Sequence, residues 1–180
     1  MTWIKPFIAV LILVLFAAAV YWIVWTPNQT IAAIQVQSSK GQKIQLGGRD
    51  GKPMLINFWA SSCKSCMEEI PHLIDIYQTW QAAGFEVIGV TMSYDPPIKA
   101  MEKVQQKNIS YPIVFDLDKK IQKHFGLRSA VTPVTILIDH EGRVSYQRIG
   151  KPDFADLREQ IKNLMSPSVK QAARSTDALG

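Results

Sequence analysis

The spacing of apolar and polar residues divides most of the chain into short strands and helices. Residues 34–37 and 43–46 each alternate between the two kinds, with Gly41 between them, which predicts a β-hairpin. Four short apolar runs have the pattern of buried strands: residues 54–59, 85–91, 113–115 and 134–138. Four segments have apolar residues at helical spacing: residues 63–81, 97–107, 119–125 and 154–165.

Residues 144–149 form one more predicted strand, which the turn sequence DHEGR at 139–143 joins to the strand before it. The order of elements is therefore a hairpin, a βαβαβ unit with a short helix, a second hairpin and a final helix. Alternating strands and helices require parallel strands with helices on both faces, whereas a tight hairpin makes the last two strands antiparallel. The sequence predicts an α/β fold with a mixed central sheet at residues 34–165, followed by a flexible tail at 166–180.

The N-terminal part of the chain has a different pattern. Residues 7–25 are nineteen consecutive residues without a charge, and as a helix they would rise about 28 Å, close to the ~30 Å core of a bilayer. Lys5 precedes this run and no Lys or Arg follows it until Lys40, which predicts a cytoplasmic N-terminus at residues 1–6. A stalk at residues 26–33 would then lead to an exported domain.

A second interpretation of the same run is a secretory signal that is cleaved. Ala17 and Ala19 have the A-x-A spacing of a signal peptidase site. The apolar run continues past them to Trp25, however, and Tyr21 and Trp22 resemble the aromatic belt at a membrane interface. We therefore expect an uncleaved transmembrane anchor, and either route delivers the domain to an oxidising compartment.

The charge and the cysteine content of the chain limit the classes of function that it can have. A net charge of +5 is spread along 180 residues without a run of five or six like charges, so we expect no nucleic-acid partner. A domain of this length can bury a core without disulfide staples. The two cysteines are therefore expected to carry chemistry rather than to hold the fold together.

Cys63 and Cys66 are the candidate reactive groups. Cys63 stands where the strand at 54–59 meets the helix at 63–81, so the N–H groups and the dipole of the helix start stabilise an anion there. Neighbouring Lys64 adds a positive charge, and both effects lower the pKa of the Cys63 thiol below the free value of about 8.5. Cys66 is one turn later and better shielded, so Cys63 is the expected attacking thiol and Cys66 the resolving thiol.

Two other roles for the cysteine pair stay open at this point. Two thiolates make half of a zinc or copper site, but the histidines on offer are only His72, His124 and His140, and we expect no metal. An inert disulfide between adjacent turns would close a very small loop and add little stability. A C-x-x-C between a strand and a helix fits redox chemistry better than either role.

A second motif, Val131-Thr132-Pro133, comes directly before the strand at residues 134–138. In the predicted fold this loop faces the helix start that carries Cys63. A cis bond between Thr132 and Pro133 would orient a backbone edge for docking an extended substrate, whereas a trans proline also begins strands and is far commoner. The residues alone leave both isomers open.

Three motifs carry a resemblance to a known family: F-W-A-x-x-C-x-x-C at residues 58–66, V-T-P at 131–133 and I-D-H-E-G-R at 138–143. Together they resemble the thioredoxin superfamily and, more narrowly, its membrane-tethered bacterial branch of the TlpA, ResA and DsbE type. The resemblance spans residues 34–165 and implies a thioredoxin fold with an N-terminal hairpin and a central insert at 94–110.

Carried over residue by residue, the resemblance makes Cys63 the nucleophile, Cys66 the resolving thiol and the two together a redox-active disulfide. It makes Pro133 the cis-proline. Thr132 and Trp59 join Pro133 as expected substrate contacts.

Glu69 matches the glutamate that ResA-like proteins hold near the active site. One turn after Cys66, it shares the face of the cysteines, where it can relay protons and raise the pKa of the thiols. The alternative is a solvated helix carboxylate like the adjacent Glu68.

Two positions depart from the family pattern. Ser62 stands where the family usually has a tryptophan, so an aromatic wall beside the first cysteine is missing. Lys64 and Ser65 separate the cysteines, and a thiolate stabilised by Lys64 favours an oxidising pair. Glu69 acts in the opposite sense, and the sequence does not rank the two effects.

The resemblance implies a reductase of the bacterial inner membrane with a periplasmic catalytic domain. A membrane electron donor keeps such proteins reduced, and their usual clients are exported proteins with disulfides, such as apocytochrome c or copper-site assembly proteins. No cofactor is expected. The alternatives are an oxidase or isomerase of exported proteins, and a copper-binding module that uses the two thiols as ligands.

Overall fold

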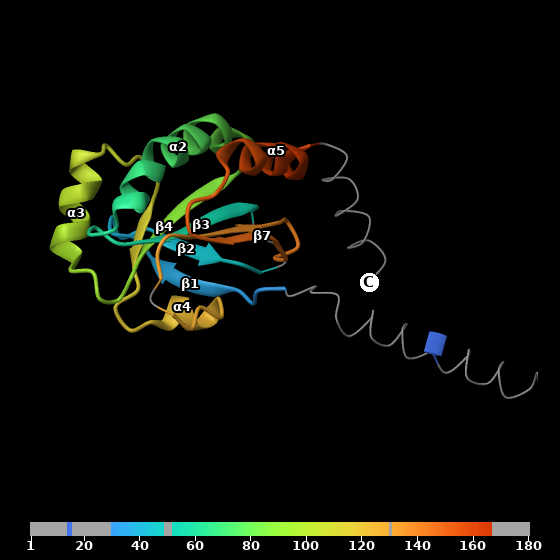
Figure 1. The fold of residues 1–180 in the computed structure, drawn as a ribbon, viewed down its shortest axis with the longest axis horizontal. Helices are drawn as coiled ribbons and strands as arrows, with labels where there is room; N and C mark the ends of the chain where they lie inside the picture. Colours follow the sequence, from blue (N-terminus) through green and yellow to red (C-terminus); the bar gives the residue numbers. More distant parts are fainter. Residues whose placement is uncertain (1–13, 16–29, 49–51, 130, 167–180) are drawn as a thin grey trace, which may run out of the picture.

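The centre of the structure is a five-stranded mixed sheet, shown in the computed structural model of Figure 1. Its strands in spatial order are β5 (Ile113–Phe115), β4 (Glu86–Thr91), β3 (Met54–Trp59), β6 (Val134–Ile138) and β7 (Val144–Ile149). β3, β4 and β5 are parallel, whereas β6 and β7 are each antiparallel to their neighbours. The predicted mixed sheet is confirmed. The structure describes residues 14–15, 30–48, 52–129 and 131–166.

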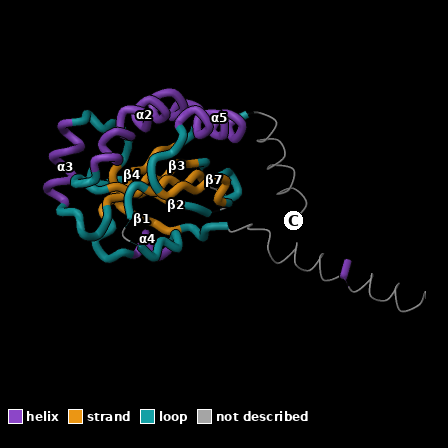
Figure 2. Tube along the Cα trace, in the orientation of Figure 1, coloured by secondary structure: helices purple, strands orange, loops and turns teal. Residues whose placement is uncertain are grey.

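Helices α2 (Lys64–Trp80) and α5 (Phe154–Met165) cover one face of this sheet, and Figure 2 shows them side by side above the strands. The core on this face combines apolar residues from both helices and from the sheet: Ile70, Leu73, Ile76, Leu157, Ile161, Leu55, Val87 and Leu137. Helix α3 (Pro97–Gln106) reaches the same core through Ala100. These side chains lie at helical spacing in α2 and α5 because one stripe of each helix must be buried against the sheet.

The opposite face carries the N-terminal hairpin and helix α4 (Lys120–His124). Strands β1 (Ile34–Gln37) and β2 (Lys43–Leu46) pair antiparallel as a separate two-stranded sheet, which confirms the predicted hairpin. Leu46 at the end of this hairpin is fully buried in the core on this face. β3 is buried along its whole length because both faces of the sheet are covered, which explains its nearly continuous apolar sequence.

Two helices differ by a residue from their predicted starts, and the backbone gives the reason. α2 begins at Lys64 because Cys63 is its N-cap, with φ −84° and ψ 109° outside the helical region. α4 begins after Lys119, whose φ of 61° lies in the left-handed region. At its far end α2 passes into a short 3₁₀ helix, Gln81–Ala83, and stops at Gly84, whose φ is 91°.

The predicted transmembrane anchor at residues 7–25 lies outside the described residues apart from the two at 14–15, as does the tail beyond residue 166. Among the residues that the structure does describe, no helix is long and apolar enough to cross a membrane. The end of the predicted stalk runs beside the turn between β6 and β7, because the Ile31 N–H donates to the Gly142 carbonyl at 2.8 Å.

Candidate active site

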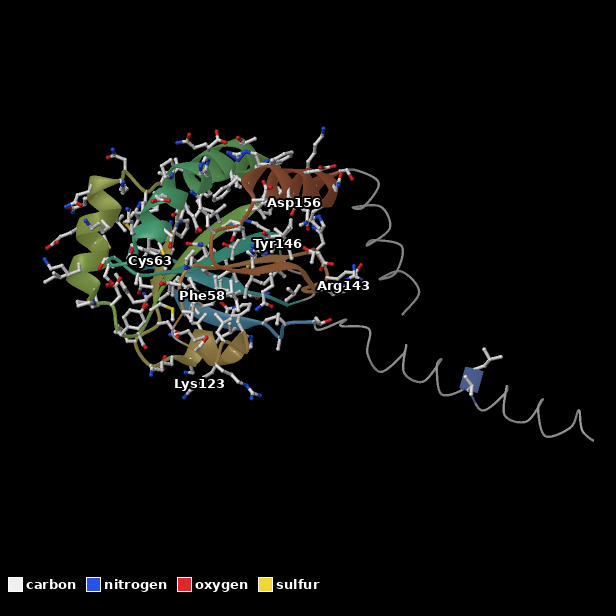
Figure 3. All side chains as sticks on the ribbon, viewed as in Figure 1. Phe58, Cys63, Lys123, Arg143, Tyr146 and Asp156 are labelled. Carbon is white, nitrogen blue, oxygen red and sulfur yellow. A yellow bond between two sulfur atoms is a disulfide. The ribbon has the colours of Figure 1, made fainter. Side chains whose placement is uncertain are left out.

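The two cysteines form a disulfide at the junction of β3 and α2, with 5.3 Å between their Cα atoms. Cys63 caps the helix: its sulfur accepts a hydrogen bond from the Cys66 N–H at 3.2 Å. Figure 3 places Cys63 at the start of α2, at the end of the sheet. Cys63 is half-buried and Cys66 is only 1 % exposed. An incoming group can therefore reach the sulfur of Cys63 far more easily than that of Cys66.

Polar residues flank Cys63 in the chain. The Ser65 hydroxyl lies 3.5 Å from the Cys63 sulfur. Ser62 and Lys64 on either side of Cys63 are exposed, so the position where the family pattern has a tryptophan is occupied by a small polar side chain at the surface. A docked chain would meet the sulfur without an aromatic wall beside it.

Glu69 lies inside the protein, one turn of α2 beyond Cys66, and is 0 % exposed. Its Oε2 atom accepts a hydrogen bond from the Asn57 amide at 3.3 Å, while Oε1 has no hydrogen-bond partner among the described residues. The Asn57 amide also donates to the Thr135 hydroxyl at 3.2 Å. The alternative of a solvated carboxylate is therefore wrong for this position. We call Glu69, Asn57 and Thr135 the buried polar cluster.

Burial controls the acidity of this carboxyl. Desolvation raises the pKa of Glu69 from 4.5 to about 7, against the smaller effects of the Asn57 hydrogen bond and the Lys151 charge, which lower it. The nearby Tyr111 hydroxyl responds in the same direction, since burial and then the charge of Glu69 raise its pKa. Glu69 can therefore change its protonation state near neutral pH while sharing the helix face of the cysteines.

The peptide bond between Thr132 and Pro133 is cis, the isomer that the resemblance implies. Pro133 is buried directly before β6, and its carbonyl accepts a hydrogen bond from the Gly150 N–H at 2.8 Å. Thr132 is half-buried and Val131 before it is exposed. A docked chain can therefore reach Val131 and Thr132.

Trp59 has a different position from the one expected of a substrate contact. Its side chain is 2 % exposed and packs in the core between the sheet and α2. Its indole N–H finds no hydrogen-bond partner in the part of the chain that the structure describes. Gly89 on the neighbouring strand leaves space for the ring, since a Cβ there would lie 3.1 Å from the indole nitrogen. Burial in the core therefore does not support the predicted contact between Trp59 and substrate.

Three polar residues near the site were not singled out from the sequence. Asn57 and Thr135 each interrupt an apolar strand, and a polar residue inside such a run is the signal that could have found them. Asp95, in the loop after β4, is buried and accepts hydrogen bonds from the Ser61 N–H at 2.8 Å and the Ser61 hydroxyl at 2.5 Å. Asp95 thus fixes the turn that leads to Cys63, and no local pattern indicates this long-range pair.

The histidines considered as metal ligands lie elsewhere. The ring of His72 stacks on Phe154 of α5 with 4.3 Å between ring centroids, and His124 contacts the Ala32 carbonyl at 2.7 Å. In the part of the chain that the structure covers, no three His, Cys, Asp or Glu side chains are grouped as they would be to hold a metal ion.

The disulfide follows β3 and the cis-proline precedes β6, and these strands pair where Phe58 lies opposite Val134. A helix-capping disulfide and a cis-proline at the same end of a mixed sheet define the class of thioredoxin-like thiol–disulfide oxidoreductases. The chain belongs to the AhpC/TSA family of this superfamily, which it matches over residues 27–147. It is 30 % identical over 129 residues to the thiol-disulfide oxidoreductase ResA of Bacillus thuringiensis, covering 72 % of this chain and 73 % of that protein.

Solved structures share the fold. A thiol:disulfide interchange protein of the thioredoxin family from Chlorobium tepidum aligns with a TM-score of 0.66 and 22 % identity, over 77 % of this chain and 97 % of its own. StoA from Bacillus subtilis aligns with a TM-score of 0.62 and 20 % identity, over 74 % of this chain and 98 % of its own. The protein is therefore a thiol–disulfide oxidoreductase of the ResA type, a class whose substrates are proteins with disulfides.

Proposed function

We propose that the protein reduces disulfides of selected exported proteins on the outer side of the bacterial inner membrane. The observation that supports this proposal is the asymmetry of the cysteine pair: Cys63 is half-buried at a helix start, whereas Cys66 is 1 % exposed. Residues 7–25 would tether the domain to the bilayer with the N-terminus in the cytoplasm. Apocytochrome c or copper-site assembly proteins are the proposed clients.

The reaction begins with the reduced pair. The Cys63 thiolate attacks one sulfur of the client disulfide; a bond forms between these two sulfurs, and the other client sulfur leaves as a thiolate that takes up a proton. Cys66 then loses its proton and attacks the Cys63 sulfur. The Cys63–Cys66 disulfide forms and the client is released with two thiols, having gained two electrons and two protons. A dithiol donor in the membrane would return two electrons to the pair.

Glu69 supports this direction of electron flow. A carboxylate near the cysteines raises the pKa of a thiol and so disfavours the thiolate that would stabilise the reduced pair. Because the pKa of Glu69 is about 7, its protonated form can give a proton and its ionised form can accept one at neutral pH. We propose that Glu69 accepts the proton that Cys66 must lose in the resolving step.

The opposite direction is the second candidate, because one observation favours it. The Cys63 sulfur already accepts a backbone hydrogen bond at the helix start, an arrangement that stabilises a thiolate and hence the reduced form. A pair whose reduced form is stabilised is an oxidant. An oxidase or isomerase would use the same two cysteines with electrons moving the other way.

Trapping of mixed disulfides, together with the redox state of the cysteine pair in cells, distinguishes a reductase from an oxidase. We expect Cys66→Ser, produced as the full chain in bacterial cells, to accumulate mixed disulfides with clients through Cys63, because the resolving thiol is gone. The matched control is the Cys63→Ser/Cys66→Ser double variant, which should trap nothing. Alkylation of thiols in intact cells then reports the resting state of the wild-type pair, reduced for a reductase and disulfide-bonded for an oxidase.

The trapped proteins name the clients. If Cys66→Ser captures no more protein than the double variant, Cys63 is not the attacking thiol and the proposed function is wrong. Stoichiometric copper held by both cysteines, together with no reduction of a protein disulfide, would instead identify a metal-binding module.

A further inference from the structure

A groove of about 830 Å³ opens on the surface beside the candidate active site. Its walls come from the loops after β4 and β5, from α4 and from the segment that connects α4 to β6. We call it the basic groove and define it by six of its lining residues: Tyr94, Leu117, Lys119, Lys123, Leu127 and Arg128. Figure 3 labels Lys123 on α4, on the same side of the sheet as the hairpin.

Two connections place the basic groove next to Cys63. Tyr94 in its wall directly precedes Asp95, whose carboxylate binds the backbone and the hydroxyl of Ser61, two residues before Cys63. On the other side, the chain runs from Arg128 in the groove to the cis bond at Pro133 within five residues. The groove therefore shares one chain segment with the loop that holds the turn before Cys63 and leads along the chain to the cis-proline.

The groove combines apolar surface with unbalanced positive charge. Leu117 is 62 % exposed and Tyr94 is 50 % exposed, unusually high fractions for large apolar or aromatic side chains. Its charged lining residues are Lys119, Lys123 and Arg128, without a carboxylate among the lining side chains.

Neighbouring carboxylates form no ion pair within 4.0 Å with these cations in the described part of the chain. Two aspartates on the same loop are engaged by the first turn of α4: Asp116 accepts bonds from the Ile121 and Gln122 N–H groups, and Asp118 accepts one from the Lys120 N–H. The positive charge of the groove is therefore available to a partner.

We propose that the basic groove binds an extended segment of the client next to its disulfide, and that this segment carries carboxylates and at least one apolar side chain. Charge complementarity favours this ligand, since its carboxylates can pair with the three cations and its apolar side chain can cover Tyr94 and Leu117. The inference rests on the proposed function, because the bound segment must belong to the protein whose disulfide meets Cys63.

The test compares three synthetic peptides that share one intramolecular disulfide and one leucine beside it, flanked by aspartates, by lysines or by serines. The full chain in non-ionic detergent is reduced beforehand, and the rate of peptide reduction gives an apparent kcat/KM for each. We expect the aspartate peptide to react fastest. The groove variant Lys123→Glu/Arg128→Glu should lower its kcat/KM about tenfold at low salt and raise that of the lysine peptide.

The matched control is Lys40→Glu/Lys162→Glu, which makes the same change in net charge at two exposed residues outside the groove. It should change each rate less than twofold. The serine peptide should react equally with wild type and both variants, which shows that the variants fold and exchange disulfides.

The outcomes are distinct. Equal rates for the aspartate and lysine peptides with wild type overturn the groove proposal while the reaction of the serine peptide still supports the proposed function. An equal loss in the control variant also overturns it, because net charge and not the groove would then govern the rate. If wild type reduces none of the three peptides, the proposed function fails and the role of the groove fails with it.

Discussion

Two polar regions lie near the cysteine pair, one inside the protein and one at its surface. The buried polar cluster of Glu69, Asn57 and Thr135 lies between α2 and the sheet, and its carboxyl accepts a hydrogen bond from Asn57. The basic groove is open to water and carries three cations that make no ion pair with the described residues. The groove carries charges and the buried cluster contains a carboxyl that can ionise, yet water reaches only the groove.

This difference in solvation decides how each region acts. Inside, the cost of desolvating a charge changes the protonation state of Glu69, so the cluster responds to pH. Outside, water and salt weaken each interaction, so the groove attracts a partner and responds to ionic strength. The buried region is suited to moving a proton, and the exposed one to selecting a client.

The largest expected effect tests the sealed region. The pKa of Glu69 is raised from 4.5 to about 7, so the folded protein holds a proton that the unfolded chain loses first. The free energy of unfolding of wild type should therefore fall, relative to Glu69→Gln, as pH rises from 4.5 to 7, by about 3 kcal/mol. Urea unfolding of the oxidised full chain across this pH range measures the difference.

Glu68→Gln is the matched control for this experiment. Glu68 is the adjacent carboxylate of α2, half exposed and paired with Lys151 at 3.3 Å. Its replacement should leave the pH dependence of the wild type in place. Parallel stability curves for wild type and Glu69→Gln between pH 4.5 and 8 would show that Glu69 does not titrate in this range, and the contrast between the two regions would be lost.

The next effect concerns the contact between the groove wall and the turn before Cys63. Asp95→Asn weakens the charged acceptor that holds Ser61, and we expect a loss of about 2 kcal/mol in the free energy of unfolding. The Ser61→Ala and double variants complete a cycle whose coupling energy should be about 1 kcal/mol. Asp118→Asn, at an exposed carboxylate with a single backbone bond, should cost less than about 0.5 kcal/mol.

A second measurement tests whether Asp95 positions the groove as well as stabilising the fold. If Asp95 holds the groove wall against the turn before Cys63, Asp95→Asn should also reduce the preference for the aspartate peptide over the lysine peptide. An unchanged preference with lowered stability would make Asp95 a structural residue only.

The smallest effect concerns salt. Raising the ionic strength from about 0.01 M to about 1 M shortens the Debye length from about 30 Å to about 3 Å. The preference of wild type for the aspartate peptide should fall several-fold over this range, measured from kcat/KM, because the groove is exposed. The titration of Glu69 in the stability curves should barely move, because buried groups are screened much less. A preference that is independent of salt would contradict an electrostatic role for the groove.

Local patterns in the sequence were sufficient to predict the positions of the strands and helices. The alternation at 34–37 and 43–46 predicted the first hairpin. Four apolar runs, together with the turn at 139–143, predicted the five strands of the sheet within a residue. The spacing of Cys63 and Cys66 places the two thiols one turn apart at a helix start, and the family resemblance implied the disulfide that the structure shows. These features depend on residues that are close together in the chain, and such residues can be read directly from the sequence.

The tertiary structure decided what surrounds that disulfide. Glu69 and Glu68 are adjacent carboxylates of one helix, and only packing shows that the first is sealed against Asn57 and Thr135 while the second is exposed. Trp59 belongs to the motif around the cysteines, but it lies in the core.

The bond between Asp95 and Ser61 and the groove from four segments also exist only in the folded chain. The sequence by itself determined which residues form each helix and strand and that the two cysteines lie one turn apart at a helix start, because these follow from short-range geometry. The fold alone decided which charges lose their water, because desolvation depends on chain segments that are distant in the sequence.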